Sequence, residues 1–171
     1  MTFISIENLT TRYNTSKGLV HALEDVSFEI GNGESIGIAG ESACGKSTLG
    51  LSLIRMISNG KIYSGKITFD GKSLLDISDD DFDKNIRWKE ISMVFQGAMN
   101  SLDPVFSVQA QFEEVLKQHN FEGDTKQSIT QSLNSVNLDE SILKKFPHEL
   151  SGGMKQRVII AMALILKPKF V

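Results

Sequence analysis

Hydrophobic and polar residues alternate along the first third of the chain in a pattern that predicts β-strands. The alternation runs through Phe3–Leu9 and Val26–Ile30, and Gly65–Gly71 is a short strand-like run bounded by glycines. Two further apolar runs, Glu34–Ala39 and Ile91–Phe95, predict buried strands. The N-terminal part of the chain is therefore expected to be rich in β-structure.

In other parts of the chain the apolar residues are spaced as in helices. Directly after residue 48 the apolar residues recur at helical intervals, at Leu49, Leu53, Ile54, Met56 and Ile57. The segment from Val108 to Lys145 is polar and helical in pattern, and it predicts two or three helices with a break near Gly123–Asp124. The acidic stretch Asp76–Asp83 predicts a solvated turn and the start of a helix. The longest apolar run, Val158–Leu166, is well short of the roughly 20 residues that span a bilayer.

The composition of the chain excludes several classes of protein and site. The chain has 171 residues, of which 40% are hydrophobic and 23% are charged, enough for one domain core. Its net charge of -3 gives no basic footprint for nucleic acid, and no signal-peptide pattern is present, so we expect a cytosolic chain. The single cysteine, Cys44, excludes an internal disulfide, and a small residue tolerated in its loop is a better interpretation than a redox role. His21, His119 and His148 lack the spacing of a structural metal site.

Residues 40–48, GESACGKST, match the phosphate-binding pattern GxxxxGK[ST] at every fixed position. The predicted order around them is strand, glycine-rich turn and helix, which is the context this motif requires. Gly40 and Gly45 lack a Cβ, so the backbone can turn its N–H groups toward phosphate oxygens at a helix start that favours negative charge. The motif therefore predicts a site for a nucleoside triphosphate with magnesium.

The side chains of this loop, which we call the P-loop, have separate expected roles. Lys46 is placed to reach the β and γ phosphates, and the Ser47 hydroxyl to ligate Mg²⁺. Thr48 is expected to support the first helical turn. Ser42, Ala43 and Cys44 are expected to contribute mainly backbone amides, and Glu41 is counted with them among the ATP-binding residues.

A second glycine-rich turn lies more than 100 residues further along the chain, at residues 150–154, with the sequence LSGGM. It is followed by Lys155–Arg157 and then by the apolar run described above. A serine and two glycines at a helix start form another terminus suited to anions. One chain thus carries two turns suited to phosphate.

Together these motifs resemble the nucleotide-binding subunit of an ATP-binding cassette (ABC) transporter, over essentially the whole chain. GESACGKST resembles the Walker A loop, Phe95–Gln96 the Q-loop, and LSGGMKQR the family signature. Tyr13 falls where this family has an aromatic residue that stacks on adenine, although a core tyrosine is the alternative. The segments VHALEDVSF, ISMVFQGAMNSLDP and PHELSGGMKQR resemble the ATPase subunits of dipeptide, oligopeptide and nickel importers.

The resemblance implies an α/β P-loop NTPase fold of the ABC type. It has an antiparallel β subdomain and the P-loop core in residues 1–96, a helical subdomain in residues 97–154, and a helix followed by the start of a strand in residues 155–171. The cofactors implied are ATP and Mg²⁺, with Gln96 completing the Mg²⁺ shell beside Ser47. The implied location is cytoplasmic and peripheral on the inner face of the cell membrane.

The resemblance also implies an assembly. Two such domains would meet head to tail, so that the signature segment of one touches ATP held by the P-loop of the other, through Leu150, Ser151, Gly152, Gly153 and Met154. The helical subdomain would receive a coupling helix from a membrane permease, and an extracytoplasmic solute-binding protein would deliver the solute. The second nucleotide-binding subunit could be identical or different.

The sequence departs from the family pattern after the signature. The family continues into a strand that ends in the Walker B aspartate, followed by the catalytic glutamate and a switch histidine, whereas this chain reaches Phe170–Val171. We therefore expect a partial ABC domain, either a cloned fragment or an incomplete reading frame, that lacks the C-terminal strands and does not hydrolyse ATP appreciably. A genuinely short protein is the alternative.

Two other functional interpretations stay open from the sequence. The chain could be a non-catalytic module that holds ATP or caps another ATPase through its signature turn. It could also belong with soluble cassette ATPases of translation or DNA repair, although the segments around Gln96 and Ser151 argue against that. Fold and motif alone do not give the transported solute.

Overall fold

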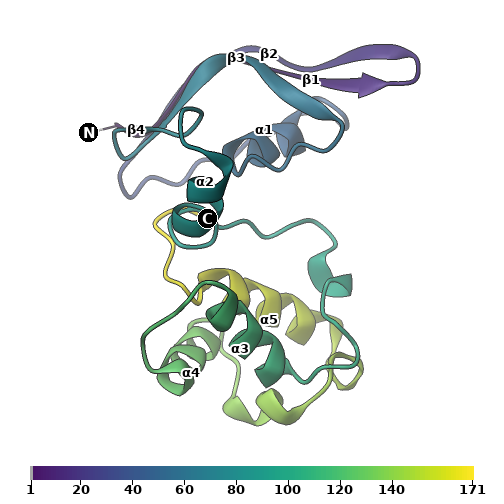
Figure 1. Cartoon of the computed structure of the whole chain (residues 1–171). Helices are drawn as coiled ribbons and strands as arrows, with labels where there is room; N and C mark the ends of the chain where they lie inside the picture. The colour runs from purple at the N-terminus through teal and green to yellow at the C-terminus, as the bar shows by residue number, and fades with distance from the viewer. Residues whose placement is uncertain (1) are drawn as a thin grey trace. The chain divides into compact units, whose positions relative to one another are not determined.

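A computed structural model describes residues 2–171 of the chain (Figure 1). The polypeptide forms two compact units, the first up to Phe82 and the second from Asp83 to Val171. Each unit has its own elements and its own buried side chains, and each is described by itself below.

The first unit is built on an antiparallel sheet with the strand order β2-β1-β3-β4. Its strands are β1 (Thr2–Thr15), β2 (Gly18–Gly31), β3 (Gly60–Phe69) and β4 (Lys72–Ser73). The predicted alternation is confirmed at Ile4 and Ile6 of β1, which are buried, and Leu9 is buried after a register shift between Ile6 and Leu9. The paired strand β3 buries Ile67 and Phe69 on the same side of the ladder. The hydrophobic period of two has fixed which face of the sheet enters the core.

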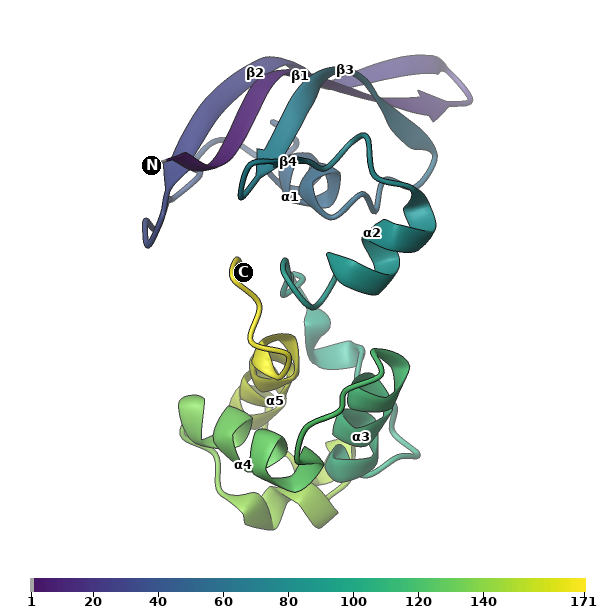
Figure 2. The ribbon, with the colours of Figure 1, turned by 60° about the vertical axis from the view of Figure 1, so that its left-hand side comes forward.

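The helix α1 (Lys46–Leu53) lies against one face of this sheet (Figures 1 and 2). Leu49 and Leu53 are buried there, and the hydroxyls of Thr11 in β1 and Ser52 in α1 are hydrogen-bonded at 3.1 Å inside the interface. The helix ends where Arg55 takes a left-handed conformation with φ 54°. Of the recurring apolar residues, Leu49 and Leu53 belong to this short helix, whereas Ile54, Met56 and Ile57 follow its end.

The short helix α2 (Asp79–Asn85) begins in the acidic stretch, as the sequence predicts. Three aspartates occupy its first turn, where negative charge is favourable, and the Ser78 hydroxyl accepts a hydrogen bond from the Asp81 N–H at 3.2 Å. Phe82 is its buried residue, and the Arg55 guanidinium lies 4.9 Å from the centre of the Phe82 ring. The acidic face is solvated while one aromatic side chain anchors the helix.

Two predicted buried strands are not strands in the structure. Residues 34–39 have no regular secondary structure, and Ile36 and Ile38 are 40% and 51% exposed. Residues 91–95 form only two isolated bridges, both at Ile91, and Phe95 is 41% exposed. A strand requires a neighbour for its backbone groups, and the described residues give neither segment a ladder partner. An alternating apolar run does not form a strand when no neighbouring strand is available for backbone hydrogen bonds.

The second unit is a cluster of helices around one core (Figure 2). Its α-helices are α3 (Val108–Gln118), α4 (Thr125–Ser135) and α5 (Gly152–Leu164), and its 3-10 turns are η1 (Ala98–Asn100), η2 (Glu140–Lys144) and η3 (Pro147–Glu149). The predicted break near Gly123–Asp124 is present between α3 and α4. Phe112 of α3, Leu133 of α4 and Val158 of α5 are among the fully buried side chains of the shared core.

Capping residues fix where these helices begin. The side chain of Ser107 accepts a hydrogen bond from the Ala110 N–H, and that of Asp124 accepts one from the Gln127 N–H at 2.9 Å. After α5 the chain forms a parallel bridge between Phe170 and Ile91, with the Ser92 N–H donating to the Phe170 carbonyl at 2.9 Å. Among residues 2–171, no helix combines the length and apolar character needed to cross a membrane.

Candidate nucleotide site and signature turn

The P-loop connects the end of the exposed segment 34–39 to the start of α1. Its backbone takes two left-handed conformations, at Ala43 with φ 65° and at Gly45 with φ 98°. Gly45 is the residue immediately before the helix, so the left-handed turn at Gly45 aims the first helical N–H groups toward the loop. The sequence expectation of a glycine-rich turn opening a helix is met in the structure.

Gly45 is required by a close approach as well as by its backbone angle. A Cβ at this position would lie 2.4 Å from the Ala22 carbonyl oxygen and 2.9 Å from the Leu23 side chain. Strand β2 therefore presses directly on the P-loop. At Gly40, a Cβ would lie 2.7 Å from the Cys44 Sγ. Because these two glycines have no Cβ, the loop backbone can approach strand β2 and the Cys44 side chain closely.

Lys46 is folded back over the loop. Its ammonium group donates hydrogen bonds to the Gly40 carbonyl at 2.8 Å and to the Glu41 carbonyl at 2.6 Å. It also lies 3.4 Å from the Cys44 Sγ. The positive charge is thus held above the ring of backbone atoms, at the position where an oxyanion cradled by the loop would need a counter-charge.

Ser47 and Thr48 lie in different environments at the start of α1. Ser47 is exposed, whereas Thr48 is 8% exposed and lies against the sheet. The Tyr13 hydroxyl donates to the Thr48 hydroxyl at 3.4 Å, and the Ser52 hydroxyl donates to the Thr48 carbonyl at 2.7 Å. The accessible hydroxyl is therefore the one expected to ligate Mg²⁺, and the buried one joins the helix to β1.

Tyr13 and the P-loop line one pocket of about 290 Å³. The strands contribute one wall and the loop with the first turn of α1 contributes the other; the lining residues are Tyr13, Val20, His21, Ala22, Ala43, Cys44, Gly45, Lys46, Ser47 and Thr48. Tyr13 is opposite Val20 in the β1–β2 ladder, which places both side by side in the wall. The structure thus brings the predicted aromatic residue to the predicted phosphate loop.

Sequence reasoning missed the β2 side of this pocket. Val20, His21 and Ala22 carry no motif, and only the hairpin register, which pairs Tyr13 with Val20 and Arg12 with His21, could have indicated them. Beside the pocket, Glu24 forms an ion pair with Arg12 at 3.1 Å, and its carboxylate also contacts Nδ1 of His21 at 2.5 Å. The hydrogen bond from Arg12 is the main cause that lowers the pKa of the Glu24 carboxyl, and His21 adds to it. The imidazole at the rim is therefore held by a carboxylate that stays ionised.

The pocket passes a test of fit for a magnesium nucleotide. It offers a backbone cradle that a Cβ at Gly45 would fill, an ammonium group above it, an exposed hydroxyl at a helix start and an aromatic ring in the opposite wall. None of its lining residues is a carboxylate. The donor set suits phosphate oxygens and a purine, with Ser47 as the protein ligand for the ion.

The signature segment (residues 150–154) forms the start of α5 in the second unit. Ser151 is the N-cap, and its side chain accepts a hydrogen bond from the Met154 N–H at 3.3 Å. Leu150 is 5% exposed and anchors the turn in the core, whereas Ser151, Gly152 and Gly153 are exposed. A Cβ at Gly153 would meet nothing within 4 Å. The turn therefore presents a serine and two bare glycine backbones outward at a helix N-terminus.

Gln96 also belongs to the second unit and does not line the P-loop pocket. It lies in a hollow of about 180 Å³ between the segment 94–99 and α5, where Gln156 and Ile159 form the helical side. Met99 of η1 is close to the signature turn, since a Cβ on Gly152 would be 3.7 Å from its sulfur. Within this unit the structure brings Gln96 and the signature helix together.

Comparison with known proteins identifies the family to which these features belong. The family model described as "ABC transporter" matches residues 23–171. This chain belongs to the ABC transporter family. The match covers the P-loop, Gln96 and the signature segment together.

Peptide-transport proteins are among the curated relatives of this chain. The chain is 39% identical over 174 residues to the oligopeptide transport ATP-binding protein AppD of Bacillus subtilis, covering 98% of this chain and 53% of that protein. It is 37% identical to the oligopeptide transport ATP-binding protein OppD of Escherichia coli, covering 97% of this chain and 50% of that protein. The chain therefore spans about half the length of the curated relatives it matches.

Solved ABC structures share the fold. The dimeric structure of the ATP-binding cassette MJ0796 in a post-hydrolysis state bound to ADP and Pi matches with a TM-score of 0.82 at 30% identity, over 96% of this chain and 70% of that one. CbiO1 from Clostridium perfringens, part of the ABC transporter complex cbiONQ, matches with a TM-score of 0.77 at 30% identity, over 98% of this chain and 62% of that one. The ABC-type P-loop fold expected from the sequence is confirmed.

Proposed function

We propose that residues 1–171 form the nucleotide-binding part of an ABC importer ATPase that takes up peptides or a similar small solute. The observation that carries this proposal is the single pocket in which Tyr13 faces the P-loop and Lys46 lies over its backbone. The names of the AppD and OppD relatives support the solute class.

In this proposal the protein binds ATP at its adenine and at its phosphates. The adenine stacks on Tyr13, beside the apolar wall formed by Val20 and Ala22, because an aromatic ring offers a large surface at little entropic cost. The phosphates lie on the N–H groups of residues 41–46, and Lys46 exchanges the Gly40 and Glu41 carbonyls for phosphate oxygens. Ser47 would hold magnesium, which would neutralise charge on the phosphate chain.

The signature segment is proposed to serve a second subunit. Its exposed residues Ser151, Gly152 and Gly153 supply N–H groups and a hydroxyl at the N-terminus of α5, which suits the γ phosphate of ATP held by the P-loop of that subunit. ATP would then join two nucleotide-binding subunits, and their closure would drive membrane permease subunits fed by a solute-binding protein. This arrangement places the working protein at the cytoplasmic face of the cell membrane.

We propose that residues 1–171 alone bind ATP without appreciable hydrolysis. A general base must lie within hydrogen-bond reach of the attacking water, directly or through one water. The P-loop pocket is lined by no carboxylate, and residues 150–171 contain no Asp or Glu. The catalytic Glu of the family therefore has no counterpart among the residues that line this pocket.

The test is a comparison of binding and phosphate release in one preparation. Titration of the chain with MgATP should show binding that Lys46→Ala abolishes, while a coupled assay detects no phosphate release above the rate without protein. Release of phosphate that persists in the wild-type chain and disappears in Lys46→Ala would overturn the non-hydrolytic part. Equal nucleotide binding by wild type and Lys46→Ala would overturn the site itself.

The solute class needs a separate experiment. In a cell that depends on di- or oligopeptides for an essential amino acid, disruption of the gene should stop growth on the peptide and leave growth on the free amino acid unchanged. Restored growth should require Lys46, since Lys46→Ala removes the ammonium group from the phosphates. Unimpaired growth on peptides without the gene would contradict peptide uptake.

A further inference from the structure

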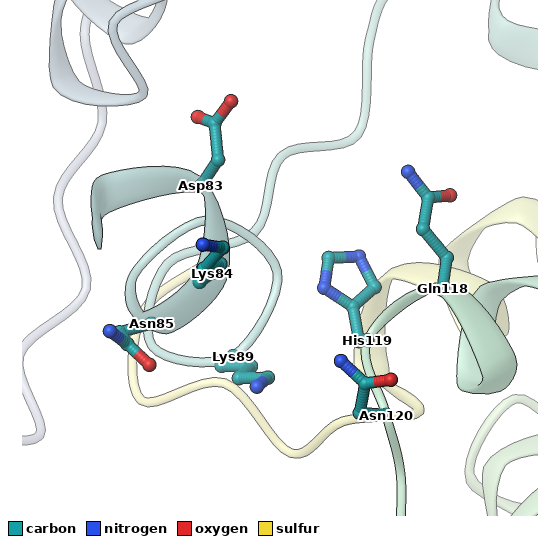
Figure 3. Close-up of a pocket in the computed structure, with 7 residues that line it drawn as sticks. All are labelled: Asp83, Lys84, Asn85, Lys89, Gln118, His119 and Asn120. Carbon is teal, nitrogen blue, oxygen red and sulfur yellow. The ribbon is translucent and has the colours of Figure 1, made fainter. Parts of the chain in front are cut away.

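A pocket of about 390 Å³ lies in the second unit (Figure 3) and shares no lining residue with the P-loop pocket or the signature segment. One wall is the segment 83–89, which runs from the end of α2, and the other is the C-terminal end of α3. The lining residues are Asp83, Lys84, Asn85, Lys89, Gln118, His119 and Asn120. Every one of these side chains is polar or charged.

The charges around this pocket are not balanced. Among residues 2–171, no carboxylate lies within ion-pair distance of Lys84 or Lys89. Asp83, the one acidic residue of the lining, pairs with Arg87 at 2.5 Å, and Figure 3 shows its carboxylate directed away from the other labelled side chains. The pocket therefore contains two ammonium groups and an imidazole, while its single carboxylate, that of Asp83, is paired with Arg87.

The C-terminal end of α3 repels an anion less than a helix end with unpaired carbonyl groups would, because its last carbonyls accept hydrogen bonds. Asn120 takes a left-handed conformation with φ 51°, its N–H donates to the Lys117 carbonyl at 3.1 Å, and the Phe121 N–H donates to the Leu116 carbonyl at 3.0 Å. These two bonds form a Schellman motif that satisfies the last carbonyls. The motif also turns His119 and Asn120 into the pocket wall.

His119 is fixed in this wall and remains sensitive to charge. Its ring lies 5.9 Å from the Trp88 ring, centre to centre, at an interplanar angle of 39°. Burial lowers the pKa of His119, and the positive charge of Lys89 lowers it further. A negative charge in the pocket would act against the second of these effects.

We propose that this pocket binds a small organic anion through its phosphate or carboxylate groups, held by Lys84, Lys89 and His119. The amide side chains of Asn85, Gln118 and Asn120 add neutral hydrogen-bonding groups around it. The bound anion joins the segment 83–89 to the end of α3, two stretches of chain about 30 residues apart. The residues that would hold the anion are not those of the P-loop, so this proposal does not depend on the proposed nucleotide function.

The first test measures anion binding by calorimetry. The probes are glycerol 3-phosphate and citrate, and the protein is the full chain carrying Lys46→Ala, which removes the phosphate ligand of the P-loop. We expect one of the probes or both to bind. Lys84→Ala combined with Lys89→Ala should raise Kd by about tenfold or more, because each lysine contributes a charge-assisted contact.

The control for this test is a double variant with the same loss of charge. Lys117→Ala and Lys126→Ala remove two exposed lysines of the same unit that do not line the pocket. They should leave Kd unchanged. Equal weakening by both pairs, or no binding of either probe at millimolar concentration, would overturn the proposal. A preference for one probe identifies which anionic group the pocket takes.

The second test leaves the pocket intact, so it holds even if the double variant fails to fold. The imidazole proton signal of His119 is followed by NMR over a pH titration, with and without the tighter-binding probe. The charged groups that share the pocket with this ring are Lys84, Lys89 and Asp83, of which Asp83 is paired with Arg87. Bound anion should raise the titration midpoint of His119 and leave that of His148 in place, whereas equal shifts at both histidines would contradict a specific site.

Discussion

At the residue scale, the P-loop depends on space that only glycine leaves. Gly45 combines φ 98° with a β2 carbonyl oxygen 2.4 Å from where a Cβ would be. Sequence motifs explain this glycine by the phosphate it serves, but the structure adds a second reason. The loop is packed against the sheet, so the same residue that opens the anion cradle also lets β2 and α1 approach.

The variant Gly45→Ala should therefore lower the free energy of unfolding by about 1–3 kcal/mol, since it combines backbone strain with a clash against backbone. Urea unfolding followed by circular dichroism measures the change. The matched control is Gly37→Ala, in a segment where a Cβ meets nothing within 4 Å and the backbone is not left-handed. Similar losses in the two variants would contradict the close-approach argument.

His119 gives a pH dependence with a definite sign. Because burial and Lys89 lower its pKa in the folded chain, the unfolded chain binds a proton more readily. Its contribution to stability is present above the unfolded pKa of about 6.5 and is lost as the pH falls below it. In a buffer free of phosphate and carboxylates, the unfolding midpoint should fall less between pH 7.5 and 5.5 in His119→Gln than in wild type.

The exposed His148 provides the comparison for this pH effect. His148→Gln should leave the pH dependence of the wild-type chain in place. If His119→Gln and His148→Gln flatten the pH dependence equally, the effect belongs to charge in general and not to the burial of His119.

At the element scale, helix starts were well specified by sequence and central strands were not. Asp124 and Ser151 each precede a helix and cap it, because a short polar side chain satisfies a free N–H locally. Glu34–Ala39 has the alternation of a strand but no ladder partner in the described residues, and a strand is not a local structure. The β2 wall of the nucleotide pocket was missed for the same reason, since only pairing brings Val20 to Tyr13.

The capping argument predicts a measurable cost at α4. Asp124→Ala removes the acceptor of the Gln127 N–H and should destabilise the chain by about 1 kcal/mol. Gln131→Ala, at an exposed position inside the same helix, should change stability by less than about 0.5 kcal/mol. Chemical denaturation of both variants decides this, and a larger effect at Gln131 than at Asp124 would show that the cap is not what sets the start of α4.

At the scale of the whole molecule, the motifs fall into different units. The P-loop and Tyr13 belong to the first unit, and Gln96 and the signature segment belong to the second. The sequence-based division at residue 96 separated the P-loop from the signature segment but grouped Gln96 with the P-loop, whereas the compact units divide after Phe82. The anion pocket beside His119 was not predicted, because no motif marks Lys84 or Lys89. The family assignment needed only the local motifs, which is why it could be made before any tertiary contact was known.

The proposed role of the signature in another subunit predicts a selective defect. Gly153→Asp should fold normally, because a Cβ there meets nothing within 4 Å, and should bind MgATP as wild type does. It should not form an ATP-dependent dimer, since a carboxylate would face the γ phosphate. Sedimentation with a non-hydrolysable ATP analogue measures this. An unchanged dimer in Gly153→Asp, or no nucleotide-dependent dimer in wild type, would contradict the role.

The central claim is that Tyr13 and the P-loop form one ATP site, and calorimetric titration with MgATP tests it most directly. Wild type should bind one ATP per chain, Lys46→Ala should show no measurable binding, and Tyr13→Ala should bind about tenfold more weakly or worse through loss of stacking. Tyr63→Ala, an exposed tyrosine of β3 outside the pocket, should bind as wild type does. Undiminished affinity in both Lys46→Ala and Tyr13→Ala would contradict the account.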